Sequence, residues 1–515
     1  MDNYLQYLIA IVIYMIVIIG IGVLFAKKAN ANSEEYFLGG RSLGPWIAAF
    51  SAEASDMSGW LLMGLPGLAY WSGLANAGWT AIGLAIGTYL NWLLISKRLR
   101  RYSEKVHAIT IPDFFSKRFH EKKKILMTIS SLMIIIFFVP YAGSCLVACG
   151  KLFSLLFNTS YPSMVILSAG FVLVYTFLGG FLAESTSDYI QAIIMILALI
   201  LVMFLGINAA GGINAIIVNA RSIPGFLSFV TSANPTGEAI NGSAIFGTPV
   251  SFSILSIIST LAWGLGYFGM PQVLLRFMGI RSEKDLKRAR RVAIIWVIIS
   301  LMAAIIIGLV GRLLFSDVYL IYGSGNTENI FILMATKLVP PLFAGFICAG
   351  ILAAAMSSSD SYLLISASAI AKNIWQDVIR KDATDKEIMI ISRIVLVLVS
   401  VLSILIAIGK NPVIFSIVDF AWAGFGAAFG PLIILSLFWK RTTYEGAIVG
   451  MLTGGVMVFI WNFFIAKLGG IWSIYELLPA FILSMLAIVI VSLLTKKPSD
   501  DILQEFIETK NIKGN

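Results

Sequence analysis

The segment Ala54-Ser55-Asp56-Met57-Ser58-Gly59-Trp60 places a carboxylate, hydroxyl groups and a glycine inside an apolar stretch that covers 46–70. A charged side chain at the depth of a bilayer costs roughly 2.5–3.5 kcal/mol or more, so it is expected to face a partner or a wet cavity. Glycine weakens a helix at this point, and Pro66 follows shortly afterwards. The segment predicts an ion or substrate site inside a membrane transporter.

A second polar segment, Ser357-Ser358-Ser359-Asp360-Ser361, follows a run of alanines in another apolar stretch. Sodium prefers oxygen ligands, and a broken helix frees backbone carbonyls to serve beside hydroxyl groups. A five-oxygen sodium site can form if the two segments face each other. Its oxygens would be the carbonyls of Ala54, Met57 and Ala354 and the hydroxyls of Ser357 and Ser358. The alternative is that these serines bond to their own helix or hold two helices together.

The carboxylates near these segments have several possible roles. Asp56 can coordinate sodium directly, support the ligands from behind, or hold the helix break open. Glu53 and Asp360 also lie at apparent membrane depth. Either can instead lie near a span end, or pair with Lys151 or Arg393. The sequence does not choose among these alternatives.

Aromatic side chains flank the same backbone interruptions. Trp60 follows Gly59, and Trp263 and Tyr267 lie in a glycine-rich stretch that ends at Pro271. Together with Tyr141, which follows a proline in another apolar stretch, they can enclose a small apolar ring. Ordinary core packing is the alternative for each of them.

The composition excludes a soluble globular protein. The chain has 515 residues, of which 59% are hydrophobic and 12% charged. Because a helix needs about 20 apolar residues to span a membrane, we expect an all-α polytopic membrane protein with about 13 transmembrane helices. The expected spans are 4–26, 45–70, 76–96, 125–155, 162–179, 188–210, 251–279, 292–314, 328–371, 389–409, 412–438, 444–466 and 475–495. The ninth is too long for one crossing and is expected to include a short outer piece around 328–340.

The charge distribution indicates the orientation in the membrane. Most of the 37 Lys and Arg residues fall in alternate loops and in the tail, whereas the opposite loops contain Arg221, Lys410 and Lys467. This pattern is typical of cytoplasmic loops, so the N-terminus is expected outside and the C-terminus in the cytoplasm of a bacterium. The net charge of +10 therefore indicates a protein of the cytoplasmic membrane, in contact with the lipid bilayer, and no nucleic-acid partner.

The interruptions in spans 2 and 7 predict an internal repeat. Since five spans separate their starts, the two spans enter the membrane from opposite faces, as in inverted-repeat transporters with discontinuous helices. We expect one transporter domain over 1–495 and a cytoplasmic tail over 496–515. Within the domain, 45–210 and 251–438 are the two repeats, and 1–44 and 439–495 are peripheral. Two unrelated kinks are the alternative.

No motif of an enzyme is present: the chain lacks a phosphate-binding GxxxxGK[ST] loop, HExxH and GxSxG. Ion coupling is therefore the expected source of energy. Asp188, at the expected inner start of span 6, can be an acidic N-cap or a group that serves cation exit or gating, and the two roles are compatible.

Longer motifs make the chain similar to members of the sodium/solute symporter family, and most of all to its proline branch. They are Leu38-Gly39-Gly40-Arg41-Ser42-Leu43-Gly44-Pro45, Ser55-Asp56-Met57-Ser58-Gly59-Trp60-Leu61-Leu62-Met63-Gly64-Leu65-Pro66-Gly67, Ala262-Trp263-Gly264-Leu265-Gly266-Tyr267-Phe268-Gly269, and Ala421-Trp422-Ala423-Gly424-Phe425-Gly426-Ala427-Ala428-Phe429-Gly430-Pro431. The resemblance implies a five-plus-five inverted-repeat fold with thirteen helices. It also implies the sodium ligands named above, with Asp56 and Ser58 supporting sodium-dependent transport.

The resemblance further implies a substrate site and coupling residues. The implied substrate residues are Trp60, Tyr141, Trp263, Tyr267 and Pro271, and Arg41 and Asp188 match positions important to gating or coupling. The expected function is sodium-coupled uptake of L-proline by alternating access, with sodium as coupling ion, no other cofactor and no obligate protein partner. A symporter for pantothenate, a sugar or a short carboxylate is the alternative, and a membrane sensor on the same fold is a more distant one.

Overall fold

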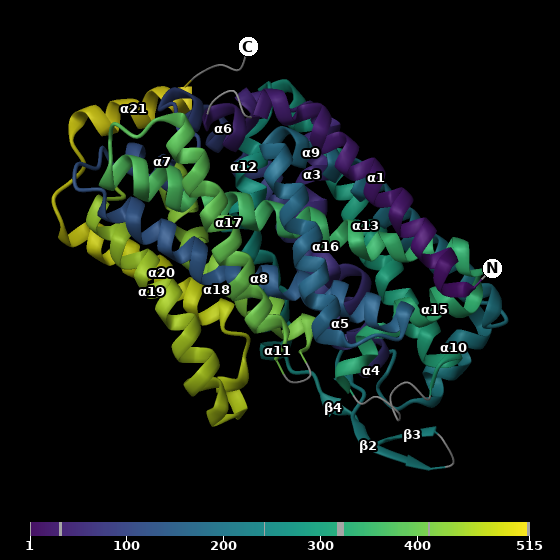
Figure 1. The fold of residues 1–515 in the computed structure, drawn as a ribbon. Helices are drawn as coiled ribbons and strands as arrows, with labels where there is room; N and C mark the ends of the chain where they lie inside the picture. Colours follow the sequence, from purple (N-terminus) through teal and green to yellow (C-terminus); the bar gives the residue numbers. More distant parts are fainter. Residues whose placement is uncertain (1, 30–32, 241–242, 317–323, 410–411, 512–515) are drawn as a thin grey trace.

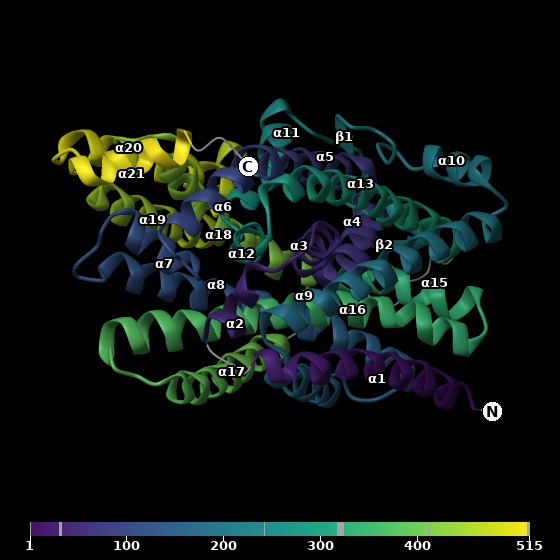
Figure 2. The ribbon, with the colours of Figure 1, turned by 90° about the horizontal axis from the view of Figure 1, so that it is seen from above.

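The structure is a computed structural model that describes residues 2–29, 33–240, 243–316, 324–409 and 412–511, so Lys410 of the charge argument lies outside the described residues. Long helices form one bundle, with short strands at one end (Figure 1). The first helix, α1 (Asn3–Ala29), lies on the outside of the bundle against α9 (Tyr161–Ala209) and α16 (Pro341–Ser368), as Figure 2 also shows. The expected all-α fold class is confirmed.

Ten helices in the described part of the chain are long and apolar enough to cross a membrane, or eleven if the bent pair Ile254–Phe268 and Pro271–Gly279 is one span. The expected spans 45–70 and 162–179 fall outside this count, although both are helical. The expected short outer piece of span 9 is a separate helix, α15 (Ile330–Leu338), which precedes α16.

The other helices follow the expected spans and loops. They are α2 (Ser33–Leu38), α5 (Leu74–Leu90), α6 (Ser96–Lys105), α7 (Ile111–Arg118), α8 (Ile125–Phe157), α10 (Ile213–Ser222), α13 (Glu283–Leu314), α17 (Asp385–Ala407), α18 (Ile414–Phe438), α19 (Tyr444–Ile460), α20 (Leu477–Leu494) and α21 (Asp500–Asn511). Short π-helical or 3-10 segments continue or join them at η1 (Gly39–Arg41), η3 (Asn91–Ile95), η5 (Ser324–Asn329), η6 (Ala369–Ile379), η7 (Trp461–Ile465), η8 (Ala466–Leu468) and η9 (Gly470–Ser473). Two antiparallel strand pairs follow α10: β1 (Thr231–Ser232) with β4 (Val250–Ser251), and β2 (Pro235–Ile240) with β3 (Ser243–Phe246).

Span 2 is interrupted at Ser58, as the sequence predicts. Its parts are α3 (Pro45–Gly59), the π-turn η2 (Trp60–Gly64) and α4 (Leu65–Ser72). Ser58 has φ 46° and ψ −168°, a conformation that costs a non-glycine residue about 1–3 kcal/mol. Pro66 lies in the first turn of α4, where a missing N–H costs little, so the break belongs to Ser58.

Span 7 is interrupted too. Its first part consists of α11 (Ile254–Leu261) and the 3-10 segment η4 (Ala262–Phe268). Its second part is α12 (Pro271–Gly279), and the two parts meet at an angle of 42°. Pro271 begins α12 and suits that position because its φ is already helical. Both predicted discontinuities are therefore present.

Spans 5 and 6 differ from the prediction. A loop was expected over 180–187, with Asp188 as an N-cap, but these residues are helical, and the chain turns at Gly180 alone (φ 59°, ψ −176°). Glycine adopts this conformation without a side-chain clash, so a single residue replaces the loop. Asp188 lies inside the helix and is fully buried, so the N-cap interpretation is wrong.

The tail is not simply polar. Its helix α21 packs on α6, and its Phe506, which is only 6% exposed, lies under the Arg118 guanidinium of α7. Glu508 forms an ion pair with Lys105, and His120 Nε2 lies 3.2 Å from Glu505 Oε2. The end of the chain thus packs on the basic side of the bundle.

Replacing Gly87 by alanine is expected to lower the thermal unfolding midpoint and the transport rate together. A Cβ atom at Gly87 would lie 2.2 Å from the carbonyl oxygen of Gly264, and backbone cannot yield as a flexible side chain can. Thermal unfolding of the purified protein measures the change. Gly170→Ala is the matched control, because a Cβ there meets no atom within 4 Å. Equal midpoints for the two variants would contradict the close contact of α5 with η4.

Candidate functional site

The expected sodium ligands come together where the break in span 2 meets α16. The Ser357 hydroxyl donates to the Ala54 carbonyl at 2.9 Å and to the Ala354 carbonyl at 3.1 Å. The Ser358 hydroxyl donates to the same Ala54 carbonyl at 3.3 Å. Four of the five expected oxygens therefore converge, and the serines also bond within their helix and across helices, as the alternative proposes.

Met57 occupies a different place from the other four. Its carbonyl accepts the backbone N–H of Trp60, and its side chain, 2% exposed, lines a neighbouring chamber. The backbone of Ser58 leaves the helical conformation between them, and the Trp60 N–H also bonds to the Ser58 hydroxyl at 3.2 Å. The Met57 carbonyl accepts this bond with one lone pair and keeps the second lone pair for a ligand.

The chamber lies between the two interrupted spans. It is lined by Asp56, Met57, Trp60, Leu84, Tyr141, Trp263, Val418 and Trp422, and its free space is about 10 Å³. That space is close to the minimum for one water molecule. The rings of Trp60 and Trp263 are stacked, with centroids 5.5 Å apart, and Trp422 stacks on Trp263 at 6.1 Å.

The expected substrate residues divide into two groups. Trp60, Tyr141 and Trp263 line the chamber. Tyr267 and Pro271 do not: the Tyr267 ring packs edge-on against Trp422, with centroids 5.0 Å apart, and Pro271 is buried at the start of α12. These two residues can act on the chamber only through their neighbours.

Asp56 joins the two interrupted spans. Its carboxylate accepts a hydrogen bond from Gln272 Nε2 at 3.2 Å, and its backbone carbonyl accepts one from the Tyr141 hydroxyl at 3.2 Å. The residue is 3% exposed and lines the chamber. Within the described part of the chain, no hydrogen bond joins the carboxylate to the Ser357 or Ser358 hydroxyl, so its position fits support of the break.

A buried ionic network lies on the other side of the sodium-site residues. The Arg276 guanidinium, fully buried on α12, contacts Glu184 closely and donates to Asp188 Oδ2 at 3.1 Å. It also donates to the hydroxyls of Ser51 and Ser361 at 2.9 Å each. Ser361 in turn donates to the Ser357 carbonyl at 3.1 Å, so the network reaches the expected sodium site.

The other membrane carboxylates have partners of their own. Glu53 accepts from Trp92 Nε1 at 3.0 Å, and Asp360 accepts from the Thr176 hydroxyl at 2.6 Å. Lys151 pairs with Glu328 at 2.6 Å. A pairing of Glu53 or Asp360 with Lys151, one of the alternatives from the sequence, is therefore wrong.

Arg41 lies far from the chamber. With φ 53°, it donates to the carbonyls of Met278 at 2.7 Å, Ser103 at 3.1 Å and Ala108 at 2.6 Å. It thereby ties the start of span 2 to α12 and to the end of α6. Arg41 does not line the chamber, and its role in gating or coupling stays a prediction.

Sequence reasoning missed several residues of the site: Glu184, Gln272, Arg276, Phe415 and Trp422. Arg276 carried the clearest signal, because it is a charged residue inside an apolar span, the same criterion that identified Asp56. Trp422 lay in a recognised motif without an assigned role. Phe415 and Gln272 carried no signal that the sequence alone could reveal.

Comparison with known proteins places the chain in one family. The model of the sodium:solute symporter family matches residues 36–454. The osmoregulated proline transporter of Bacillus subtilis is 41% identical over 96% of this chain and 96% of its own length. The sodium/proline symporter of Haemophilus influenzae is 42% identical over 97% of this chain and 96% of its own length.

Solved structures show the same fold. An outward-open, substrate-bound Na⁺-coupled sialic acid symporter superposes with a TM-score of 0.76 at 20% identity and covers 97% of this chain and 100% of that protein. Mhp1, a nucleobase-cation-symport-1 family transporter, in a closed conformation, gives a TM-score of 0.56 at 13% identity, over 93% of this chain and 99% of that protein. The chain therefore has the inverted-repeat transporter fold of sodium symporters.

Proposed function

Since the chain belongs to the sodium:solute symporter family, we propose that it carries L-proline across the cytoplasmic membrane together with sodium. It is a membrane transporter and not an enzyme. The observation that carries the choice of proline is the identity of 41–42% with two proline transporters over nearly the whole chain. Pantothenate, sugars, short carboxylates and a sensor role have no comparable support.

Sodium binds, in this proposal, where Ser357 and Ser358 meet the carbonyls of Ala54 and Ala354. The Ser357 hydroxyl lies 2.9 and 3.1 Å from the carbonyls of Ala54 and Ala354, and the Ser358 hydroxyl lies 3.3 Å from the Ala54 carbonyl, so one cation can reach these oxygens together. The hydroxyl protons must turn away from the Ala54 carbonyl when the ion arrives. Met57 supplies the fifth oxygen through its backbone carbonyl, and Asp56 and Ser58 support the break.

L-proline binds beside the sodium, with its ring against Trp60, Tyr141 and Trp263. The indole N–H of Trp60 is buried and has no hydrogen-bond partner among the described residues, so it can donate to the proline carboxylate. Backbone amides freed at Ser58 offer further donors. The chamber must widen to admit the substrate, because a space of about 10 Å³ is near the minimum for one water molecule.

Coupling runs through the hydrogen bonds that join α16 to α12. Ser357 is linked through Ser361 to Arg276, and Arg276 to Asp188. A cation at Ser357 can therefore shift α12, the second part of the second interrupted span, through these hydrogen bonds. Arg41 stabilises the closed position of the inner end of α12 through its bond to the Met278 carbonyl. We propose that the protein reorients readily only with both ligands or neither.

In the membrane, 45–210 and 251–438 form the repeats, the N-terminus lies outside, and the C-terminus lies in the cytoplasm.

Radiolabelled proline uptake into proteoliposomes tests the function. One charge moving through 100 mV gives about 2.3 kcal/mol, and a tenfold sodium gradient adds about 1.4 kcal/mol, so one sodium can drive accumulation of about several hundredfold. Replacing external sodium by choline must abolish accumulation. Equal uptake in the two media would refute coupling, and sodium-driven uptake of another solute alone would refute proline as substrate.

Replacing Trp263 by alanine is expected to raise the half-saturating concentration of proline by about tenfold or more, because a buried aromatic contact contributes about 1.5–3 kcal/mol. The half-saturating concentration of sodium should change less, since Trp263 makes no contact with Ser357 or Ser358. Initial uptake rates over a matrix of both concentrations measure the two effects. Trp263→Phe, which keeps a ring, should lose less. A larger effect on sodium than on proline would contradict the placement.

A further inference from the structure

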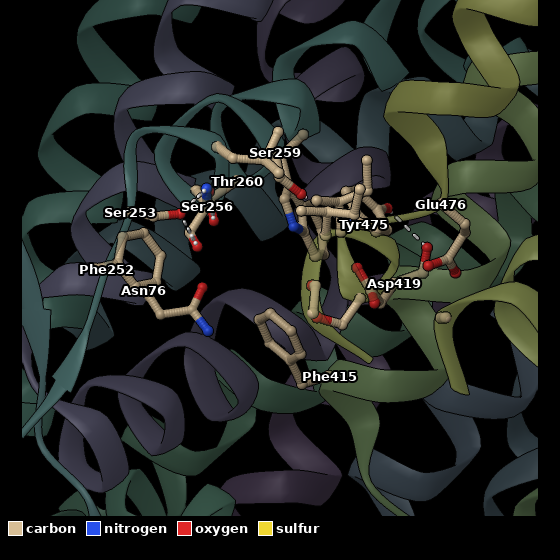
Figure 3. Close-up of a pocket in the computed structure, with 17 residues that line it drawn as sticks. Asn76, Phe252, Ser253, Ser256, Ser259, Thr260, Phe415, Asp419, Tyr475 and Glu476 are labelled. Carbon is tan, nitrogen blue, oxygen red and sulfur yellow. Dashed lines mark hydrogen bonds between the residues drawn. The ribbon is translucent and has the colours of Figure 1, made fainter. Parts of the chain in front are cut away.

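A cavity of about 560 Å³ lies on the side of the bundle away from the basic helices α6 and α7 (Figures 1 and 3). Its walls come from the start of α5, from α11 and the residues before it, from α18, and from the chain between α19 and α20. It is wide enough for a small organic molecule, for which binding cavities are about 300–1,000 Å³. Nothing in the chamber mechanism above uses this space.

The two walls of this outer cavity differ in chemistry. Asn76, Ser253 and Ser256 lie along one side in Figure 3, where they present amide and hydroxyl groups. Asp419 and Glu476 lie along the opposite side and present carboxylates. Aromatic side chains, among them Phe415, line the space between. The cavity therefore has a neutral donor wall, an anionic wall and an apolar floor.

The anionic wall is not neutralised by the protein. Glu476 is 4% exposed. Asn462 donates to its Oε1 at 2.9 Å, and no hydrogen bond from a described residue reaches its Oε2. The Tyr475 hydroxyl donates at 2.8 Å to the backbone carbonyl of Asp419 and lies within hydrogen-bonding reach of its carboxylate, but it brings no positive charge. No lysine or arginine of the described chain forms an ion pair with either carboxylate. An unpaired buried carboxylate facing a cavity favours a cationic ligand group.

Trp263 connects this cavity with the chamber, because its ring lines both. It stacks on Trp60 in the chamber at 5.5 Å and on Tyr475 in the outer cavity at 5.4 Å. Phe415 packs against Trp263 at 5.3 Å and against Trp60 at 6.0 Å. A ligand in the outer cavity is thus separated from the chamber by one layer of aromatic rings.

From these observations we infer that the outer cavity is a second binding site for the transported amino acid, occupied before the aromatic layer opens. The ammonium group lies toward Asp419 and Glu476, the carboxylate toward Asn76 and Ser256, and the apolar ring over the aromatic floor. The identity of the ligand as L-proline rests on the proposed function. The site itself requires no sodium, because the protein's own carboxylates supply the charge.

Protection of an introduced cysteine tests the site. The native Cys145, Cys149 and Cys348 are buried, so a membrane-impermeant maleimide labels mainly a cysteine placed in the cavity by Leu255→Cys, which keeps the polar groups of the proposed site. Labelling of the purified full-length protein is followed in choline medium without sodium. With L-proline at ten times its dissociation constant, labelling should slow about tenfold, because only the empty cavity reacts. Ser222→Cys, exposed on α10, is the control and should show no protection.

The charge of the wall is tested in the same background. Asp419→Asn with Glu476→Gln should remove the protection, and Glu476→Gln alone should weaken it if the double variant does not fold. Pyrrolidine, which lacks the carboxylate, and tetrahydrofuroate, which lacks the amine, should each protect less than proline in the protein with both carboxylates. Absence of protection by proline, or protection that survives both substitutions, would overturn the inference. Equal protection by pyrrolidine or by sodium ions would overturn it in favour of a general cation site.

Failure of this inference can be told apart from failure of the proposed function. Sodium-driven proline uptake by the parent protein in proteoliposomes reports the function and does not depend on labelling. If uptake is present and protection is absent, only the outer site is wrong. If uptake is absent, proline is the wrong ligand for both sites.

Discussion

Replacing Arg276 by methionine should lower the free energy of unfolding by about 3–5 kcal/mol, the usual effect of removing one partner from a buried ion pair. The guanidinium is fully buried and is the only described cation that pairs with Glu184 and Asp188. Methionine has a similar length and cannot satisfy either carboxylate. Because the same guanidinium bonds to Ser361 beside the proposed sodium site, transport should be lost as well. Thermal unfolding in detergent, followed by uptake measurements, gives both effects.

Arg281→Met is the matched control for this prediction. Its side chain is 59% exposed and pairs with Asp285 in the first turn of α13, so the change should leave the unfolding midpoint near that of the parent protein. Adding Glu184→Gln and Asp188→Asn to Arg276→Met should restore part of the stability without restoring transport. An Arg276→Met protein that unfolds at the parent temperature would show that the network is not ionised as the geometry indicates.

Replacing either Ser357 or Ser358 by alanine should raise the half-saturating sodium concentration by about tenfold to a hundredfold. A bond to a charged group contributes about 1.5–3 kcal/mol, and alanine removes one oxygen from the ion. The maximal transport rate at saturating sodium should fall less, since the aromatic chamber is intact. Sodium titrations of proline uptake measure the shift.

Ser359→Ala is the control within the same segment. Its hydroxyl donates to the carbonyls of Ala355 and Met356 at 2.7 and 3.2 Å, both in its own helix, and makes no contact with span 2. Its sodium dependence should stay near that of the parent. If Ser359→Ala shifted the sodium dependence as far as Ser357→Ala, the effect would be one of helix packing, and the proposed ligands would be wrong.

The fold was predictable where hydropathy and helix-breaking residues determine it. Long apolar stretches defined the bundle, and the discontinuities near Ser58 and in 262–270 followed from glycine, serine and proline in otherwise apolar spans. The loop over 180–187 was not predictable. A polar run usually indicates a loop, but here Glu184 and Asp188 are buried against Arg276, which satisfies them inside a helix.

The site was predictable only in part. Residue types and the family resemblance selected the Ala54 carbonyl and the serines of α16, which lie together in the fold. Partners on distant spans were not accessible, because Gln272 and Phe415 meet the site through tertiary packing that no local pattern encodes. No pattern in the sequence connects Asp419 with Glu476, and the two residues line one cavity only in three dimensions.

The claim that sodium and proline meet between the two broken helices is tested most directly by measuring the dissociation constant of proline by calorimetry at several sodium concentrations. Thermodynamic linkage requires that sodium strengthen proline binding by the same factor by which proline strengthens sodium binding. We expect reciprocal strengthening of about tenfold or more in the parent protein, much reduced in Ser357→Ala. A proline dissociation constant that is the same in sodium and in choline would contradict the account.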